Sequence, residues 1–97
     1  MTERTIAIGD VHGRSAALAA LVRVIDPTAL DTLVFLGDYI DRGPDSRGVL
    51  DQVIALAERC VVAPLLGNHE EMLLAALEGP SELRYWLKFG GTDALAS

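Results

Sequence analysis

Three short apolar runs recur along the chain, and each leads directly into a polar loop that contains glycine. The runs are Arg4–Ile8, Thr32–Leu36 and Val61–Leu66, whose length and β-branched residues are typical of strands. A segment with helical periodicity follows each of them, so the predicted order is βαβαβα. This alternation predicts an α/β fold with parallel strands, whose carboxyl ends gather along one edge of the sheet.

The predicted helices carry apolar residues three and four positions apart. We expect them over Ser15–Ile25, from Asp45 or Ser46 onward, over Glu70–Leu77, and from Ser81 to about Phe89. The residues expected to face inward are Leu18, Leu21, Val22 and Ile25 on the first helix, Val49, Leu50, Val53, Ile54 and Ala57 on the second, and Met72, Leu73, Ala76 and Leu77 on the third. Gly90 and Gly91 are expected to end the last helix.

The composition narrows the class of protein. With 97 residues, 51% of them hydrophobic, the chain is expected to form part or all of one globular unit, and its net charge of −6 argues against nucleic-acid binding. The start, residues 1–4, has no basic leader segment, and no apolar run approaches the roughly 20 residues that a membrane span needs. We therefore expect a cytoplasmic protein without membrane contact, and a buried, inert thiol at the lone Cys60.

The three loops at the strand ends hold the side chains that could bind metal ions or act in catalysis. They are Gly9-Asp10-Val11-His12-Gly13, Gly37-Asp38-Tyr39-Ile40-Asp41-Arg42-Gly43 and Gly67-Asn68-His69-Glu70. In a parallel sheet such loops lie side by side where α/β proteins bind ligands, so their side chains should converge. An acidic protein that accepts a phosphate there needs metal cations to reverse the local field.

The ligand types in the first two loops suit metal ions. Asp10 and His12 lie two residues apart, so both can hold one ion. Asp38 has two carboxylate oxygens and could bridge two ions about 3.5–4 Å apart, and Arg42 could clamp phosphate oxygens beside them. The plainer interpretation of each residue in isolation is a helix cap, a turn residue or a solvent-facing histidine.

The third loop suggests acid catalysis. Asn68 offers a neutral carbonyl oxygen to a second ion, and His69 could give a proton to a leaving alkoxide because histidine titrates near neutral pH. Asp41 could accept a hydrogen bond from the other nitrogen of that ring and fix its tautomer. A satisfied structural histidine is the alternative for His69 considered alone.

Together the three blocks resemble those of calcineurin-like metallophosphoesterases, in particular the bacterial Ser/Thr protein phosphatase branch. The resemblance extends to the tail Trp86-Leu87-Lys88-Phe89-Gly90-Gly91. It implies the N-terminal half of an αββα sandwich, with residues 1–97 as the N-terminal part of a single domain and metal-site loops at the C-terminal ends of the strands. It also implies two divalent metal ions, Mn²⁺ first and Fe, Zn or Ni otherwise, and a hydroxide between them that attacks phosphorus.

The resemblance also assigns roles residue by residue. It makes Asp10 and His12 ligands of the first metal, Asp38 the bridge and Asn68 a ligand of the second. It assigns phosphate binding to Arg42, and proton transfer to His69 together with Asp41. The expected function is a dinuclear-metal hydrolase that acts on a phosphorylated protein or a small phosphate ester.

Two departures keep alternatives open. The family needs two further metal-binding histidines downstream, which predicts that the chain is a fragment, so a catalytically incomplete metal-binding fragment is one alternative. Leu66 stands where protein phosphatases commonly carry Arg, which weakens that assignment. Symmetrical diadenosine tetraphosphate hydrolases tend to have an apolar residue there but usually lack the Asp41-Arg42 pair, so the substrate stays open. Half a domain would also expose apolar surface for association, with Tyr85, Trp86 and Phe89 as the first candidate and core packing as the alternative.

Overall fold

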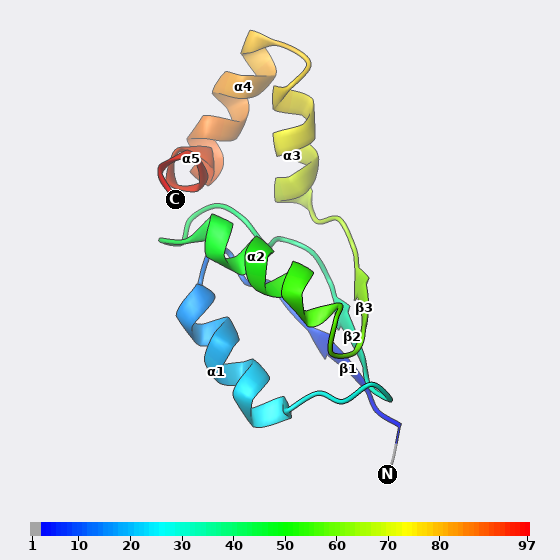
Figure 1. Cartoon of the computed structure of the whole chain (residues 1–97). Coiled ribbons are helices and arrows are strands. Elements are labelled where there is room, and N and C mark those ends of the chain that lie inside the picture. Colours follow the sequence, from blue (N-terminus) through cyan, green and yellow to red (C-terminus); the bar gives the residue numbers. More distant parts are fainter. Residues whose placement is uncertain (1–2) are drawn as a thin grey trace.

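The computed structural model describes residues 3–97, so Met1 and Thr2, which belong to the expected unit 1–97 and to the start judged free of a leader, lie outside the described residues. Strands and helices alternate along the chain as expected (Figure 1). The elements are β1 (Thr5–Ile8), α1 (Ser15–Ile25), β2 (Thr32–Phe35), α2 (Ser46–Leu56), β3 (Val61–Pro64), α3 (Asn68–Ala76), α4 (Pro80–Trp86), the kinked segment η1 (Leu87–Gly91) and α5 (Thr92–Ala96).

The sheet is parallel and its strands follow the chain order. β1 pairs with β2 and β2 with β3, so that Thr5, Thr32 and Val61 lie in one row. Right-handed crossovers that step in one direction place their helices on the same face of a sheet. Figure 1 accordingly shows α1 and α2 on one side of the strands, and the α/β fold with parallel strands is confirmed.

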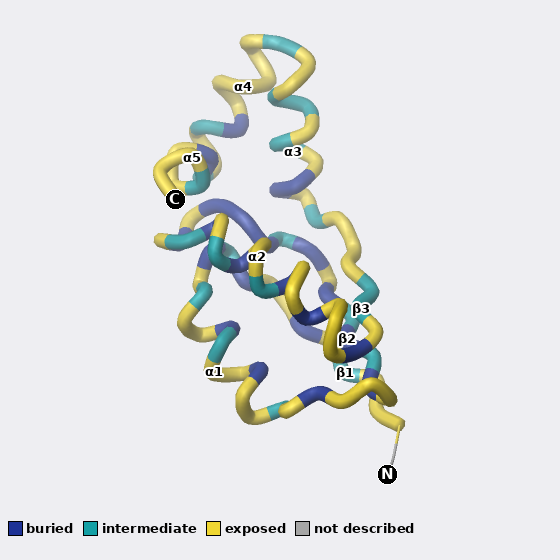
Figure 2. Tube along the Cα trace, viewed as in Figure 1, coloured by how far each residue is buried: buried dark blue, intermediate teal, exposed yellow. Residues whose placement is uncertain are grey.

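The core lies between the sheet and these two helices. Leu33 and Phe35 of β2 are fully buried, and Val49 of α2 packs in the same cluster. Strand side chains alternate between faces, so their neighbours point to the other side. There Ala7 is exposed and Val61 is 55% exposed, and Figure 2 shows burial concentrated on the side of the helices.

Five expected core positions on the helices are exposed, which corrects the width of the predicted apolar faces. Leu21 is 42% exposed, Leu50 37%, Ile54 71% and Leu77 77%, and Ala57 lies exposed beyond the end of α2. Both α1 and α2 rest on a single sheet face, so only a narrow stripe of each is covered. α1 and α2 also pack against each other and α5 contacts α2, yet these contacts leave Leu50 and Ile54 exposed.

Helix boundaries differ from prediction where glycine and tertiary contacts decide them. α3 begins at Asn68, two residues before the expected Glu70, so the third loop forms the first turn of this helix. The last predicted helix ends earlier, at Trp86, and the chain kinks at Gly90, whose φ of 109° is left-handed. α5 then follows, which the sequence did not predict.

None of the helices within residues 3–97 is long and apolar enough to cross a bilayer.

A bidentate ion pair closes the amino-terminal edge of the sheet, opposite the loops. Arg4 donates from Nε to Oδ1 of Asp31 at 3.0 Å and from Nη2 to Oδ2 at 2.7 Å. The amide of Thr28 also donates to Oδ2 at 2.8 Å. The hydrogen bond from Arg4 is the main reason why the pKa of the Asp31 carboxyl falls to about 2.

Cys60 is buried, as predicted from its apolar surroundings. Its Sγ donates to the carbonyl oxygen of Leu56 at 3.6 Å. Burial raises the pKa of this thiol, so little of the reactive thiolate forms at neutral pH. The thiol is therefore a packing group.

Candidate metal centre

Backbone hydrogen bonds join the first loop to the second. The amides of Val11 and His12 both donate to the carbonyl oxygen of Asp38, at 3.1 and 2.9 Å, and the amide of Gly13 donates to that of Tyr39 at 2.8 Å. These bonds continue the pairing of β1 with β2 beyond the strands. The two loops therefore form one rigid unit at the carboxyl edge of the sheet.

Glu70 joins the second loop to the third. Its buried carboxylate accepts hydrogen bonds from the amides of Asp38 at 2.6 Å, Tyr39 at 2.9 Å and Gly67 at 2.9 Å. Bonds to a carboxylate are about twice as strong as neutral ones. The sequence analysis gave Glu70 no role, although its place three residues after Gly67 is the position from which a Glu commonly caps a helix start.

Asp10, His12 and Asp38 converge as predicted. Each offers one ligand atom, and these atoms lie within 4.8 Å of one another. Nε2 of His12 is 3.8 Å from Oδ2 of Asp10. An imidazole nitrogen with carboxylate oxygens suits the borderline and hard divalent metals, so the donor set fits a metal ion.

The tautomer of His12 is fixed by the second loop. Its Nδ1 lies 2.9 Å from the carbonyl oxygen of Ile40, and a carbonyl oxygen can only accept. Nδ1 therefore carries the hydrogen, which leaves the lone pair of Nε2 directed toward Asp10. An outer hydrogen bond of this kind is the usual support of a metal-binding histidine.

Left-handed backbone concentrates in these loops. Four residues other than glycine have positive φ there, namely His12 at 43°, Asp38 at 55°, Asp41 at 75° and Arg42 at 67°. Such conformations cost free energy and are kept where the surrounding structure enforces them. The loop conformation thus follows from the hydrogen bonds to Glu70 and between the loops, not from local preference.

His69 pairs with Asp41, as predicted. Nδ1 of His69 is 2.9 Å from Oδ2 of Asp41, and both side chains are buried. The carboxylate accepts the hydrogen on Nδ1, so Nε2 is the ring nitrogen that can exchange a proton. The rings of His69 and His12 meet edge to face with centroids 4.7 Å apart, which places the pair directly beside the metal-ligand group.

Trp86 is a contact of the site that the sequence analysis missed. Its Nε1 donates to Oδ2 of Asp41 at 2.6 Å, and the indole is only 3% exposed. Trp86 is therefore a core residue, the alternative to an association surface, whereas Tyr85 and Phe89 are exposed. A lone tryptophan in the tail was the only available signal, because a buried indole N–H needs an acceptor.

Two predicted residues lie at the rim. Asn68 is the first residue of α3, with an exposed side chain beside His69, and Arg42 is exposed next to Asp41. Both positions are compatible with the expected contacts to a second ion and to phosphate. Those two roles stay predictions.

A cleft of about 520 Å³ opens beside His69, between α3 and α4. Its floor is apolar and aromatic, with Met72, Tyr85 and Phe89, and the last two rings lie 4.8 Å apart. Glu71 and Glu82 place carboxylates at its sides. This cleft therefore adjoins the His69–Asp41 pair through its lining residue His69.

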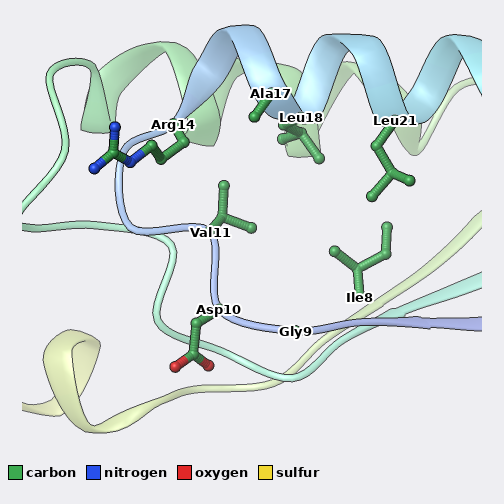
Figure 3. A pocket seen from close by; sticks show the side chains of 8 residues that line it. All are labelled: Ile8, Gly9, Asp10, Val11, Arg14, Ala17, Leu18 and Leu21. Carbon is green, nitrogen blue, oxygen red and sulfur yellow. The ribbon is translucent and has the colours of Figure 1, made fainter.

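A second pocket, of about 310 Å³, lies behind the first loop and under α1 (Figure 3). Ile8, Val11 and Leu18 make it apolar. Figure 3 shows the carboxylate of Asp10 turned away from these side chains. Asp10 therefore borders this pocket while its carboxylate belongs to the metal-ligand group on the other side of the loop.

Comparison with known proteins adds named relatives. The chain is 40% identical over 79 residues to the symmetrical bis(5'-nucleosyl)-tetraphosphatase of Burkholderia pseudomallei strain 668, an alignment that covers 81% of this chain and 27% of the relative. The proteins of the same name from Burkholderia thailandensis and Burkholderia mallei match equally well. The chain therefore spans about a quarter of the length of these curated relatives.

Structural and family comparisons agree with this. A crystal structure of a protein provisionally assigned as a diadenosine tetraphosphatase superposes with a TM-score of 0.64 and 28% identity, over 89% of this chain and 42% of that one. The family model of calcineurin-like phosphoesterases matches residues 3–96, which include all three loops and the tail. The family inferred from the three motif blocks is thereby confirmed, whereas its protein phosphatase branch is not shown, and the chain belongs to the calcineurin-like phosphoesterase family.

Proposed function

We propose that this chain forms the metal-binding part of a symmetrical diadenosine tetraphosphate hydrolase. The observation that carries the proposal is the group Asp10, His12 and Asp38 placed against the His69–Asp41 pair. The named relatives favour this substrate over a phosphorylated protein, which was the main expectation from sequence. Leu66, 63% exposed before Gly67, leaves the position without the arginine that the resemblance associates with protein phosphatases.

The metal-binding roles follow from the donor atoms. Members of the family typically bind divalent metals, and Asp10, His12 and Asp38 fit one ion by their types and spacing. Asp38 with Asn68 would hold a second ion. Bound ions supply Lewis-acid stabilisation of phosphoryl oxygens and lower the pKa of water.

The protein groups then handle the proton and the leaving group. His69 gives the hydrogen on Nε2 to the leaving phosphate oxygen while its Nδ1–H stays on Asp41. Arg42, exposed at the rim, binds a non-bridging oxygen of the substrate. Symmetrical cleavage releases ADP on the side of His69.

The cleft between α3 and α4 is suited to the adenosine part of that leaving group. Tyr85 and Phe89 offer adjacent, exposed aromatic rings for the base, and stacking on such rings tolerates any base. Glu71 and Glu82 can accept hydrogen bonds from the amino group or the ribose hydroxyls. An aromatic leaving nucleoside therefore fits better here than a further anionic group.

The test compares three substrates with added Mn²⁺: diadenosine tetraphosphate, p-nitrophenyl phosphate and a phosphothreonine peptide. The proposal expects the dinucleotide to be preferred and ADP to be its sole nucleotide product. Equal amounts of ATP and AMP would contradict symmetrical cleavage. Preference for the peptide would instead support hydrolysis of phosphorylated proteins. Mn²⁺ binding without turnover of any substrate would support the incomplete metal-binding fragment.

A matched pair of variants tests the cleft. Tyr85→Ala should raise KM for diadenosine tetraphosphate about tenfold, because stacking is worth about 1–3 kcal/mol per base, and should leave KM for p-nitrophenyl phosphate within twofold. Leu95→Ala, an exposed apolar residue of α5 outside this cleft, is the control. Equal effects of Tyr85→Ala on both substrates would contradict the nucleoside site.

A further inference from the structure

We propose that Trp86 is a positioning residue that holds Asp41 in place and, through it, orients His69. Its indole N–H and the Nδ1–H of His69 meet on the same oxygen, Oδ2 of Asp41, at 2.6 and 2.9 Å. Trp86 lies 45 residues from Asp41 in sequence and belongs neither to the metal-ligand group nor to the residues that line the cleft beside His69. Its effect on turnover rests on the proposed function, whereas its contact with Asp41 does not.

The environment of Asp41 explains why it needs this donor. The side chain of Asp41 is fully buried, and Oδ1 has no hydrogen-bond partner within residues 3–97. A buried carboxylate is costly unless it is hydrogen-bonded, so the two donors on Oδ2 decide where the group sits. Without the indole, the carboxylate would keep only His69 and could rotate about its side-chain torsions.

The tail encloses the loop around Asp41 from a second direction. Gly90 packs so closely that a Cβ there would meet Cβ of Asp41 at 2.9 Å and the amide nitrogen of Arg42 at 2.8 Å. Gly91 lies against the Trp86 ring, where a Cβ would fall within 2.6 Å of Cε2. The Trp86–Gly91 segment is therefore fitted to this loop, which accounts for the tail glycines that the metal chemistry leaves unexplained.

Trp86 and His69 reach Asp41 from neighbouring helices. His69 is on the first turn of α3 and Trp86 is the last residue of α4, and these two helices pack as a hairpin (Figure 1). The backbone of Asp41 is held separately, since its amide donates to Oγ of Ser46 at 3.0 Å. The indole therefore acts on the carboxylate and not on the loop backbone.

The first experiment detects the hydrogen bond from Trp86 to Asp41 by NMR and requires no enzymatic turnover. The chain has a single tryptophan, so its one indole ¹H–¹⁵N signal needs no assignment by mutation. A short bond to a carboxylate should shift this signal downfield, and Asp41→Asn should move it upfield because bonds to neutral acceptors are weaker. An indole signal of the folded wild-type chain at the position of free N-acetyl-tryptophanamide would overturn the proposal.

The second experiment measures positioning. Trp86→Phe keeps most of the ring volume and removes the N–H. It should lower kcat for phenyl phosphate, a poor leaving group, about tenfold, lower kcat for p-nitrophenyl phosphate much less, and leave KM and Mn²⁺ affinity unchanged, because acid catalysis matters most for poor leaving groups. Equal losses on both substrates, or a change confined to KM, would overturn it.

Leu56→Ala is the matched control, since Leu56 is 4% exposed on α2 and takes no part in the hydrogen bonds to Asp41. It should destabilise the fold without changing the ratio of the two kcat values. If neither substrate is turned over, the ¹⁵N shifts of His69 give the answer: Trp86→Phe should mix its tautomers and Leu56→Ala should not. An unchanged tautomer in Trp86→Phe would overturn the proposal independently of the proposed activity.

Discussion

The backbone amide of His69 donates to Oδ1 of Asp38 at 3.0 Å. The residue proposed to give the proton and the residue proposed to bridge the metals are therefore held together by one hydrogen bond between α3 and the second loop. The first turn of α3 thus directs a backbone amide at the Asp38 carboxylate. We therefore expect metal binding at Asp38 to affect the position of His69.

Asp38→Asn should weaken Mn²⁺ binding by at least about tenfold. The amide can still accept the bond from His69 through its oxygen, but it removes a negative charge and one oxygen ligand from the metal group. Isothermal titration calorimetry measures this affinity. Asp51→Asn, on the exposed surface of α2, removes the same charge and should have no effect. Equal affinity in the two variants would contradict a metal site at Asp38.

Glu70→Gln should lower the free energy of unfolding by about 2 kcal/mol, because an amide nitrogen cannot accept the backbone N–H groups that now meet a carboxylate. Urea unfolding followed by circular dichroism measures the loss. Glu78→Gln makes the same change at an exposed position after α3 and should stay within about 0.5 kcal/mol of the wild type. Similar stabilities would show that Glu70 does not hold the loops together.

Gly43→Ala and Gly9→Ala should differ sharply, although both glycines belong to the site loops. A Cβ at Gly43 would overlap the carbonyl oxygen of His12, whereas one at Gly9 meets nothing within 4 Å. We expect a loss of about 1–3 kcal/mol for the first substitution and a change within about 0.5 kcal/mol for the second. Thermal unfolding of the two variants checks this, and equal melting temperatures would contradict the packing of the loops.

The Arg4–Asp31 pair should make stability depend on pH in the acid range. The folded-state pKa of Asp31 is lowered to about 2 from the ordinary aspartate value of 3.8, chiefly by the hydrogen bond from Arg4. Its contribution is therefore complete above about pH 4 and is lost as the pH falls through 2. The stability difference between the wild type and Asp31→Asn, from urea unfolding, should shrink over this interval.

The ligand geometry could be predicted from sequence because the topology sets it. Strands that alternate with helices must be parallel, and parallel strands bring their following loops to one edge. Asp10, His12 and Asp38 come together for this reason, and His69 meets Asp41 as expected. Local pattern and long-range geometry agree at these positions.

The supporting contacts could not be predicted, since they depend on how distant segments pack. The bond from Trp86 to Asp41 depends on the packing of α4 beside the second loop, and the role of Glu70 depends on the second loop against α3. The apolar periodicity of α2 also overstated its buried face, as Ile54 shows. Mn²⁺ as the metal, a cytoplasmic location, association through apolar surface and the absence of nucleic-acid or membrane partners stay predictions.

The left-handed residues of the loops bear on how such a centre can be transplanted. Grafting Asp, His and Asp onto the strand ends of another parallel sheet would copy the ligand identities but not the φ values of His12, Asp38 and Asp41. Each of these conformations costs about 1–3 kcal/mol, so an unsupported graft would relax away from the binding geometry. A working design would have to include the buried Glu70, and glycines such as Gly43 where a Cβ would clash, together with the ligand residues as one unit.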